Sequence, residues 1–135
     1  MIVFKENKDI SKNEVLKLYE NAAWTSYTAD LEKLLRAIKK SNLVISAWQN
    51  HQLVGLIRTI GDDETICYIQ DILVLEEYKR KGIGTQLLQK VLEKSQNIRQ
   101  IVLLTDAQDS NVRKFYESQD FKSCDDGELV SFIKK

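Results

Sequence analysis

The chain has 135 residues, 43% of them hydrophobic, and its 20 basic and 20 acidic side chains cancel. This length predicts a single domain, residues 1–135, with an apolar core of its own. The balanced charge argues against a protein-wide field that would attract nucleic acid or an anionic membrane. No apolar run is long enough to cross a bilayer, and the first residues lack a signal-peptide core. We therefore expect a cytoplasmic protein with neither nucleic acid nor membrane as a partner.

The chain contains two cysteines, Cys67 and Cys124. They are too few and too far apart in sequence for a disulfide framework or a metal knuckle. We expect both to be reduced packing residues, and the sequence offers no metal site.

The first third of the chain predicts one strand and two helices. Residues 2–5 are typical of a strand, and Ser11 followed by Glu14 is a capping-box pattern that starts a helix. Residues 22–27 have no helical period. Thr28 can then cap a second helix, whose apolar residues at positions 31, 34, 35 and 38 line one face.

The middle of the chain predicts three antiparallel strands. Residues 43–48 and 53–60 are rich in aliphatic side chains and flank the polar link 49–52, as in a hairpin. The turn at 61–63 leads into a further strand at 65–75.

A strand, a loop and a helix follow one another over residues 68–88, and this stretch carries the clearest functional signal. Gly82 and Gly84 leave the start of the helix without side chains, so its unpaired amides can approach a ligand. The preceding residues Lys79, Arg80 and Lys81 add positive charge. This combination predicts a site for a phosphate or pyrophosphate.

The last third predicts a strand at 98–105, a helix starting at Ser110-Asn111 and a final strand at 129–133. The strand at 98–105 follows a crossover helix, so we expect it to run parallel to the strand at 65–75, with the glycine loop at their carboxyl ends. Open α/β sheets bind ligands at that end.

Two familiar phosphate-binding motifs do not fit. A dinucleotide fold needs a third glycine where Leu87 stands and a carboxylate about twenty residues later, where the sequence is apolar. The Gly-Lys-Ser/Thr of nucleotide hydrolases is also absent.

The pattern resembles the GNAT N-acetyltransferase superfamily. Residues 79–84, Lys-Arg-Lys-Gly-Ile-Gly, resemble its Gln/Arg-x-x-Gly-x-Gly/Ala signature, with lysine in the first place, and residues 71–78 resemble the strand and entry loop before it. Residues 115–121, Phe-Tyr-Glu-Ser-Gln-Asp-Phe, resemble a second family motif in which Asp120 replaces glycine. The chain is similar to small single-domain members, including plant chloroplast enzymes that resemble serotonin N-acetyltransferase.

The resemblance implies an α/β (α+β) GNAT fold with a mixed sheet of six to seven strands and four helices, in the order β-α-α-β-β-β-α-β-α-β. It implies direct acetyl transfer from acetyl-CoA to a primary amine in a ternary complex. No metal or covalent intermediate is needed. The acceptor would be a small-molecule amine or a protein amino group. Relatives often dimerise, so a homodimer is compatible with the resemblance.

The resemblance also assigns residues to acetyl-CoA. The pantetheine arm would lie along the first parallel strand and the pyrophosphate on the glycine loop, with an N–H near Ile72 or Leu73 as an oxyanion donor. Tyr116 matches the tyrosine that protonates the departing thiolate, while Asn111 is either a coenzyme contact or a plain helix cap. The coenzyme-binding residues are therefore Ile72, Leu73, Val74, Leu75, Lys79, Arg80, Lys81, Gly82, Ile83, Gly84, Thr85, Asn111 and Tyr116.

The general base is not evident. The positions where relatives carry a base hold Tyr68 and Gln70, and neither is basic near neutral pH. A water held by these two residues and strand carbonyls could relay the proton. Asp71 is a carboxylate in an apolar strand, so it is paired structurally, binds the substrate amine or acts as the base.

The acceptor is expected where the link between the first two helices meets the strands. Trp24 and Tyr27 could wall a pocket there together with Tyr68, although Trp24 could equally fill the edge of the core. The alternative function is a non-catalytic acyl-CoA-binding or regulatory module on the same scaffold, which the absence of a strong base favours and Tyr116 opposes.

Overall fold

The structure, a computed structural model, describes all residues from 1 to 135. The chain forms two compact units, Met1–Leu103 and Leu104–Lys135. The first unit contains the sheet and helices α1 to α4, and the second contains helix α5.

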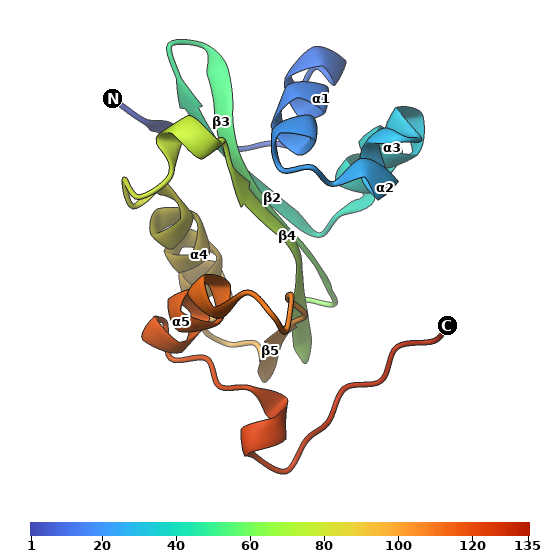
Figure 1. The fold of residues 1–135 in the computed structure, drawn as a ribbon, viewed down its shortest axis with the longest axis vertical. Coiled ribbons are helices and arrows are strands. Elements are labelled where there is room, and N and C mark those ends of the chain that lie inside the picture. Colours follow the sequence, from blue (N-terminus) through green and yellow to red (C-terminus); the bar gives the residue numbers. More distant parts are fainter. The chain divides into compact units, whose positions relative to one another are not determined.

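A mixed five-stranded sheet organises the first unit, in the order β1-β2-β3-β4-β5 (Figure 1). Neighbouring strands are antiparallel except β4 and β5, which are parallel. The predicted crossover unit and the mixed α/β sheet are therefore confirmed. The strands are β1 (Val3–Glu6), β2 (Leu43–Gln49), β3 (Gln52–Gly61), β4 (Ile66–Val74) and β5 (Gln100–Leu103).

The predicted counts of strands and helices are wrong. The sheet has five strands rather than six to seven, because no residue after Leu103 joins it and residues 129–133 form no strand. The structure has five α-helices rather than four, since α2 (Thr25–Thr28) adds a single turn where the sequence shows no period. One turn is too short to display a repeat. The next helix, α3 (Leu31–Lys40), is capped by Asp30 rather than by Thr28.

The helices of the first unit cover opposite faces of the sheet. Figure 1 shows α1 (Lys12–Asn21), α2 and α3 on one side and α4 (Ile83–Lys94) on the other. A Cβ on Gly55 of β3 would lie 3.3 Å from side-chain atoms of both Ile83 and Leu87, so a larger residue there would push α4 outward. Gly55 thus lets the first turn of α4 pack directly on the sheet next to Val74, its partner on β4.

The predicted hairpin between β2 and β3 is confirmed. Asn50 and His51 form its two-residue turn, and both have positive φ, at 51° and 66°. Two such residues are typical of the turn whose twist matches that of paired strands.

A bulge at Gln70 changes the direction of the side chains along β4. Arg58 pairs with Asp71 and Thr59 pairs with Ile69, which leaves Gln70 without a partner on β3. The extra residue resets the alternation, so Ile69 and Asp71 point to opposite faces although they are two apart. In a strand without a bulge, two residues that are two apart would point to the same face.

The second unit contains α5 (Ser110–Ser118) and a cluster of three aromatic rings. Phe115 and Phe121 each contact Tyr116 edge to face, with ring centroids 5.1 and 5.7 Å away. Asp120 has φ of 68°, as its replacement of a motif glycine suggests. Cys124 is free but exposed, so the expectation of a packing residue is wrong there, whereas Cys67 is free and buried as expected.

Candidate active site

The parallel strands β4 and β5 are paired only along the first half of β4. Their pairing ends at Ile69 and Leu103, while β4 continues to Val74 along β3 alone. The N–H of Leu75 donates to Val54 on the β3 side, at 2.9 Å. Because successive N–H groups of a strand point to opposite edges, those of Ile72 and Val74 face the unpaired edge. Backbone donors and acceptors are therefore available to a ligand along this half of β4.

The amino terminus of α4 lies at the end of this strand and has free donors. Gly82 is the residue before the helix, has φ of 81° and offers no side-chain cap. The amides of Ile83, Gly84 and Thr85 have no hydrogen-bond partner in the protein, and the first bond back to the loop comes from Gln86 to Gly82. Unpaired amides at the positive end of a helix dipole form an anion site.

The basic residues of this loop are exposed and only partly engaged. Lys79 Nζ lies 3.0 Å from the carboxylate of Glu76, and Lys81 Nζ lies 5.2 Å from the centre of the Tyr78 ring. Arg80 has φ of 64°, a left-handed conformation two residues before that of Gly82. Exposed ion pairs are weak, so Lys79 can exchange Glu76 for a stronger anion.

Asp71 forms a buried ion pair with Arg58 on the face that α1 to α3 cover. Arg58 Nε lies 2.5 Å from Asp71 Oδ2, and both side chains are at most 5% exposed. Arg58 also donates to Ser41 Oγ and Tyr27 Oη, each at 3.2 Å. All three guanidinium nitrogens therefore have partners.

Two tyrosines complete the shell around Asp71. Tyr19 Oη donates to Oδ2 at 2.9 Å and Tyr27 Oη donates to Oδ1 at 2.8 Å. Burial, followed by the nearby Asp71 carboxylate, raises the pKa of both phenols. These phenols stay protonated donors, and together with Arg58 they give the side chain of Asp71 three donor residues.

The aromatic residues predicted for the acceptor lie beside this ion pair. Tyr19, Trp24 and Tyr27 form a cluster with ring centroids 5.4 to 6.1 Å apart. Gln70 is exposed at the bulge and its Nε2 donates to Tyr27 Oη at 3.0 Å, which leaves its amide oxygen without a partner. The structure therefore brings Trp24, Tyr27, Gln70 and Asp71 together.

Tyr68 lies on β4 two residues before the bulge and is half-buried. It pairs with Ile60 of β3 and Val102 of β5, in the half of β4 where both edges are occupied. Its backbone is therefore paired on both edges within the sheet, and only its side chain is available to contact a substrate.

The remaining predicted residues, Asn111 and Tyr116, belong to the second unit. Asp109 caps α5 by accepting from the amides of Asn111 and Val112, so Asn111 is not the cap, and its side chain is exposed. Tyr116 is buried, and burial raises the pKa of its phenol to about 12.

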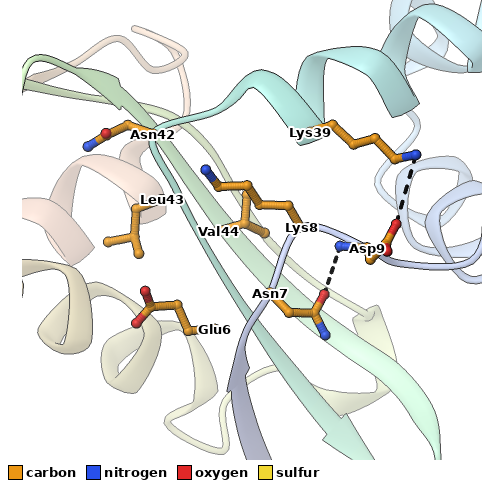
Figure 2. Close-up of a pocket in the computed structure, with 8 residues that line it drawn as sticks. All are labelled: Glu6, Asn7, Lys8, Asp9, Lys39, Asn42, Leu43 and Val44. Carbon is orange, nitrogen blue, oxygen red and sulfur yellow. Dashed lines mark hydrogen bonds and ion pairs between the residues drawn. The ribbon is translucent and has the colours of Figure 1, made fainter.

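A separate open hollow of about 530 Å³ lies beside the start of β2. Figure 2 shows that charged and polar side chains dominate it, with Lys39 3.8 Å from Asp9. It shares no residue with the candidate site, and its ion pairs are exposed to solvent. Its lining residues are Glu6, Asn7, Lys8, Asp9, Lys39, Asn42, Leu43 and Val44.

Sequence reasoning missed Arg58, Tyr19 and Ser41 as members of the Asp71 cluster. Arg58 could have been found by the same signal as Asp71, because it is a charge inside an apolar strand. Tyr19 looked like an ordinary member of the apolar stripe of α1, and its hydroxyl partner lies 52 residues away.

The family model described as an acetyltransferase (GNAT) domain matches residues 6–133. The chain belongs to the GNAT acetyltransferase family.

Individual GNAT proteins support this assignment. The structure is similar to a GNAT family acetyltransferase from Streptococcus pneumoniae, with 31% identity, a TM-score of 0.88, and coverage of 100% of this chain and 98% of the other. An uncharacterized N-acetyltransferase of Pyropia yezoensis is 25% identical over 130 residues, which are 93% of this chain and 73% of the relative. The fold is also shared by an N-acetyltransferase from Thermoplasma acidophilum in complex with coenzyme A, at 20% identity, TM-score 0.71 and 90% and 91% coverage.

No helix in the structure has the length and apolar character needed to cross a membrane.

Proposed function

We propose that this GNAT protein transfers an acetyl group from acetyl-CoA directly to a primary amine bound beside it. The observation that carries the proposal is the free N–H row at the start of α4, adjoining the half of β4 that has no partner on one edge. The row suits a diphosphate, and an extended pantetheine arm can hydrogen-bond to a strand edge as a further strand would.

The coenzyme would occupy the residues named from the sequence. Residues 79–85 would hold the diphosphate, and residues 72–75 would contact the pantetheine arm. Among the two candidate oxyanion donors, Ile72 is favoured because its N–H faces the unpaired edge, whereas that of Leu73 faces β3. An N–H aimed at the thioester oxygen would stabilise the charge that develops there as the amine attacks.

The amine would bind at Gln70, with Trp24, Tyr27 and Tyr68 around it. The free amide oxygen of Gln70 can accept a hydrogen bond from the amine or from a water that carries its proton away. Asp71 acts here as a positioning residue, because its contacts with Tyr27 and Arg58 fix the groups around Gln70. Tyr116 would protonate the departing thiolate, and we propose that the two units, residues 1–135, work together as one acetyltransferase domain.

A second candidate function has a specific observation in its favour. Asp71, the carboxylate nearest the proposed acceptor, is already bound by three side chains. A protein without a free base could bind acyl-CoA and regulate a partner without turnover.

One experiment separates the two. CoA released from acetyl-CoA is measured by chromatography against small primary amines and lysine-containing peptides, because the exposed thiol of Cys124 would react with thiol reagents. Binding of CoA is followed in parallel by thermal shift. Turnover on any amine supports the enzyme, binding without turnover on the whole panel supports the module, and no binding at all refutes both.

A further inference from the structure

The side-chain amide of Gln70 has a fixed orientation. Tyr27 Oη carries one hydrogen, which it donates to Asp71 Oδ1 at 2.8 Å. Its lone pairs accept from Arg58 Nη2 at 3.2 Å and from Gln70 Nε2 at 3.0 Å. A Gln70 oxygen turned toward this phenol would therefore meet no donor. The network directs the amide nitrogen of Gln70 at Tyr27 and leaves the amide oxygen available to a ligand.

The carboxylate of this network is closed to a ligand. Asp71 Oδ1 accepts from Tyr27, while Oδ2 accepts from Tyr19 and Arg58. The side chain of Asp71 is only 2% exposed. The other titratable groups around Gln70 are phenols and a guanidinium, which belong to Tyr19 of α1, Tyr27 of α2, Arg58 of β3 and Tyr68 of β4.

Exposed acidic residues on the neighbouring elements stay outside the network. They are Glu20 of α1, Asp30 before α3, and Glu76 and Glu77 after β4, and none of their carboxylates bonds to a member of it. Glu76 pairs instead with Lys79. An ammonium group at Gln70 would therefore exchange water for a neutral amide oxygen, with no opposite charge to compensate.

We infer that the acceptor is a weakly basic amine that binds in its neutral form, of the kind found at the α-amino group of a peptide or an amino-acid amide. This inference rests on the proposed acetyl transfer and narrows its substrate. An α-amino group has a pKa of about 8, against about 10.4 for a lysine side chain. At pH 7 about 10% of the α-amino groups are therefore neutral, against about 0.04% of the lysine amines.

The proton balance of the reaction also favours a neutral amine. As the amine nitrogen bonds to the acetyl carbon and the C–S bond breaks, the nitrogen loses one proton and the thiolate gains one. A neutral amine therefore supplies the proton that the thiol needs, and no further base is required. An ammonium group carries one proton more, which a base would have to take, and the network at Gln70 has none free.

Two isomers with the same atoms test the inference. Nε-acetyl-lysine amide has only its α-amino group free, and Nα-acetyl-lysine amide has only its ε-amino group free. Rates of CoA release, corrected for the reaction without enzyme, should give a kcat/KM at pH 7 that is at least about tenfold higher for the α-amine. The greater nucleophilicity of the ε-amine offsets only part of the difference in neutral fraction. Between pH 7 and pH 9 the kcat/KM of the ε-amine should rise about 100-fold, in step with its neutral fraction.

The variant Gln70→Glu places a carboxylate where the neutral oxygen lies. It should reduce the preference for the α-amine by at least about tenfold, because an ammonium group then has both a partner and a base. Gln89→Glu, which adds the same charge on the exposed side of α4, is the control and should keep the preference of the wild type.

Three results would overturn the inference. The first is equal rates or a preference for the ε-amine at pH 7, and the second is a plateau in its kcat/KM below pH 9, which would show that a group on the protein takes the proton. The third is a Gln70→Glu variant that binds CoA with an unchanged preference; if that variant does not fold, the two wild-type measurements decide. Turnover of either amine still supports the proposed acetyl transfer in these cases. If neither amine is acetylated the inference fails, while the wider panel of amines still decides the proposed function.

Discussion

The carboxylate of Asp71 and the guanidinium of Arg58 face each other across paired strands, 2.5 Å apart and closed off from solvent. Removing one charge leaves the other buried without a partner. The substitution Asp71→Asn should therefore lower the free energy of unfolding by about 3–5 kcal/mol. Urea denaturation measures this, and the double variant Arg58→Met/Asp71→Asn should recover part of the loss because no buried charge remains.

The same variant tests the role of Asp71 in the reaction. If Asp71 positions Tyr27 and Gln70, the rate of Asp71→Asn should keep the pH dependence of the wild type while its magnitude falls. If the variant folds and binds CoA but its rate no longer depends on pH, Asp71 is the base and the relay through Gln70 is wrong.

Alkaline pH should destabilise the protein through Tyr19. Burial raises the pKa of this phenol in the folded state, so between the unfolded pKa of about 10 and the higher folded value the folded chain holds more protons than the unfolded one. The contribution is fully present below about pH 10 and is lost as the pH rises further. Tyr19→Phe should be less stable at neutral pH, since it lacks the bond to Asp71, but should lose stability less steeply above pH 10. Parallel curves for the two proteins would contradict this.

Gly82 should contribute to the affinity for the coenzyme. Its φ of 81° disfavours any side chain, although no atom lies within 4 Å of the position of a Cβ. Gly82→Ala should therefore strain the loop by about 1–2 kcal/mol and turn its amides away from the diphosphate. Calorimetry should show CoA affinity reduced by about tenfold. Gly127→Ala is the control, because Gly127 has an ordinary φ of −126° and should leave affinity unchanged.

Neutralising the loop cations should weaken CoA binding and its dependence on salt. The triple variant Lys79→Gln/Arg80→Gln/Lys81→Gln removes the charges beside the amides, and we expect about a tenfold loss of affinity at low salt that shrinks as salt screens the wild type. Lys12→Gln, which removes an exposed lysine paired with Glu32 on the α1 side, is the control. An unchanged salt dependence in the triple variant would mean that the diphosphate lies elsewhere.

Tyr116 should affect turnover and not binding. Tyr116→Phe should lower kcat by about 100-fold or more, as loss of a general acid does, with the Kd for CoA unchanged. Because burial raises its pKa to about 12, the wild-type phenol remains a proton donor through pH 10. Phe115→Leu, in the same aromatic cluster, controls for damage to its packing, and equal losses in the two variants would rule out the acid role.

The loop at Gly82 could be predicted from the sequence because its signals are local. Two glycines, three cations and an apolar strand lie within twenty residues. The mixed sheet and the hairpin at Asn50 followed in the same way from patterns within single segments.

The partner of Asp71 could not be predicted, because it depends on two features that lie outside the local sequence pattern. Arg58 lies on another strand, and the bulge at Gln70 determines which face Asp71 occupies. Residues 129–133 have the composition of a strand, but a strand also has to pair with a neighbour, and composition does not report whether that pairing forms. The single turn of α2 is shorter than the repeat that would reveal it.

Gln70 has no partner on β3, so the alternation of side chains along β4 changes at this residue. Ahead of it Ile69 belongs to the layer beneath α4, and behind it Asp71 belongs to the layer beneath α1. Deleting this one residue would make Ile69 and Asp71 neighbours, and the regular alternation of a strand would then keep each of them on its present face, opposite Thr59 and Arg58. The extra residue therefore places an exposed amide in the middle of the sheet without disturbing either buried layer.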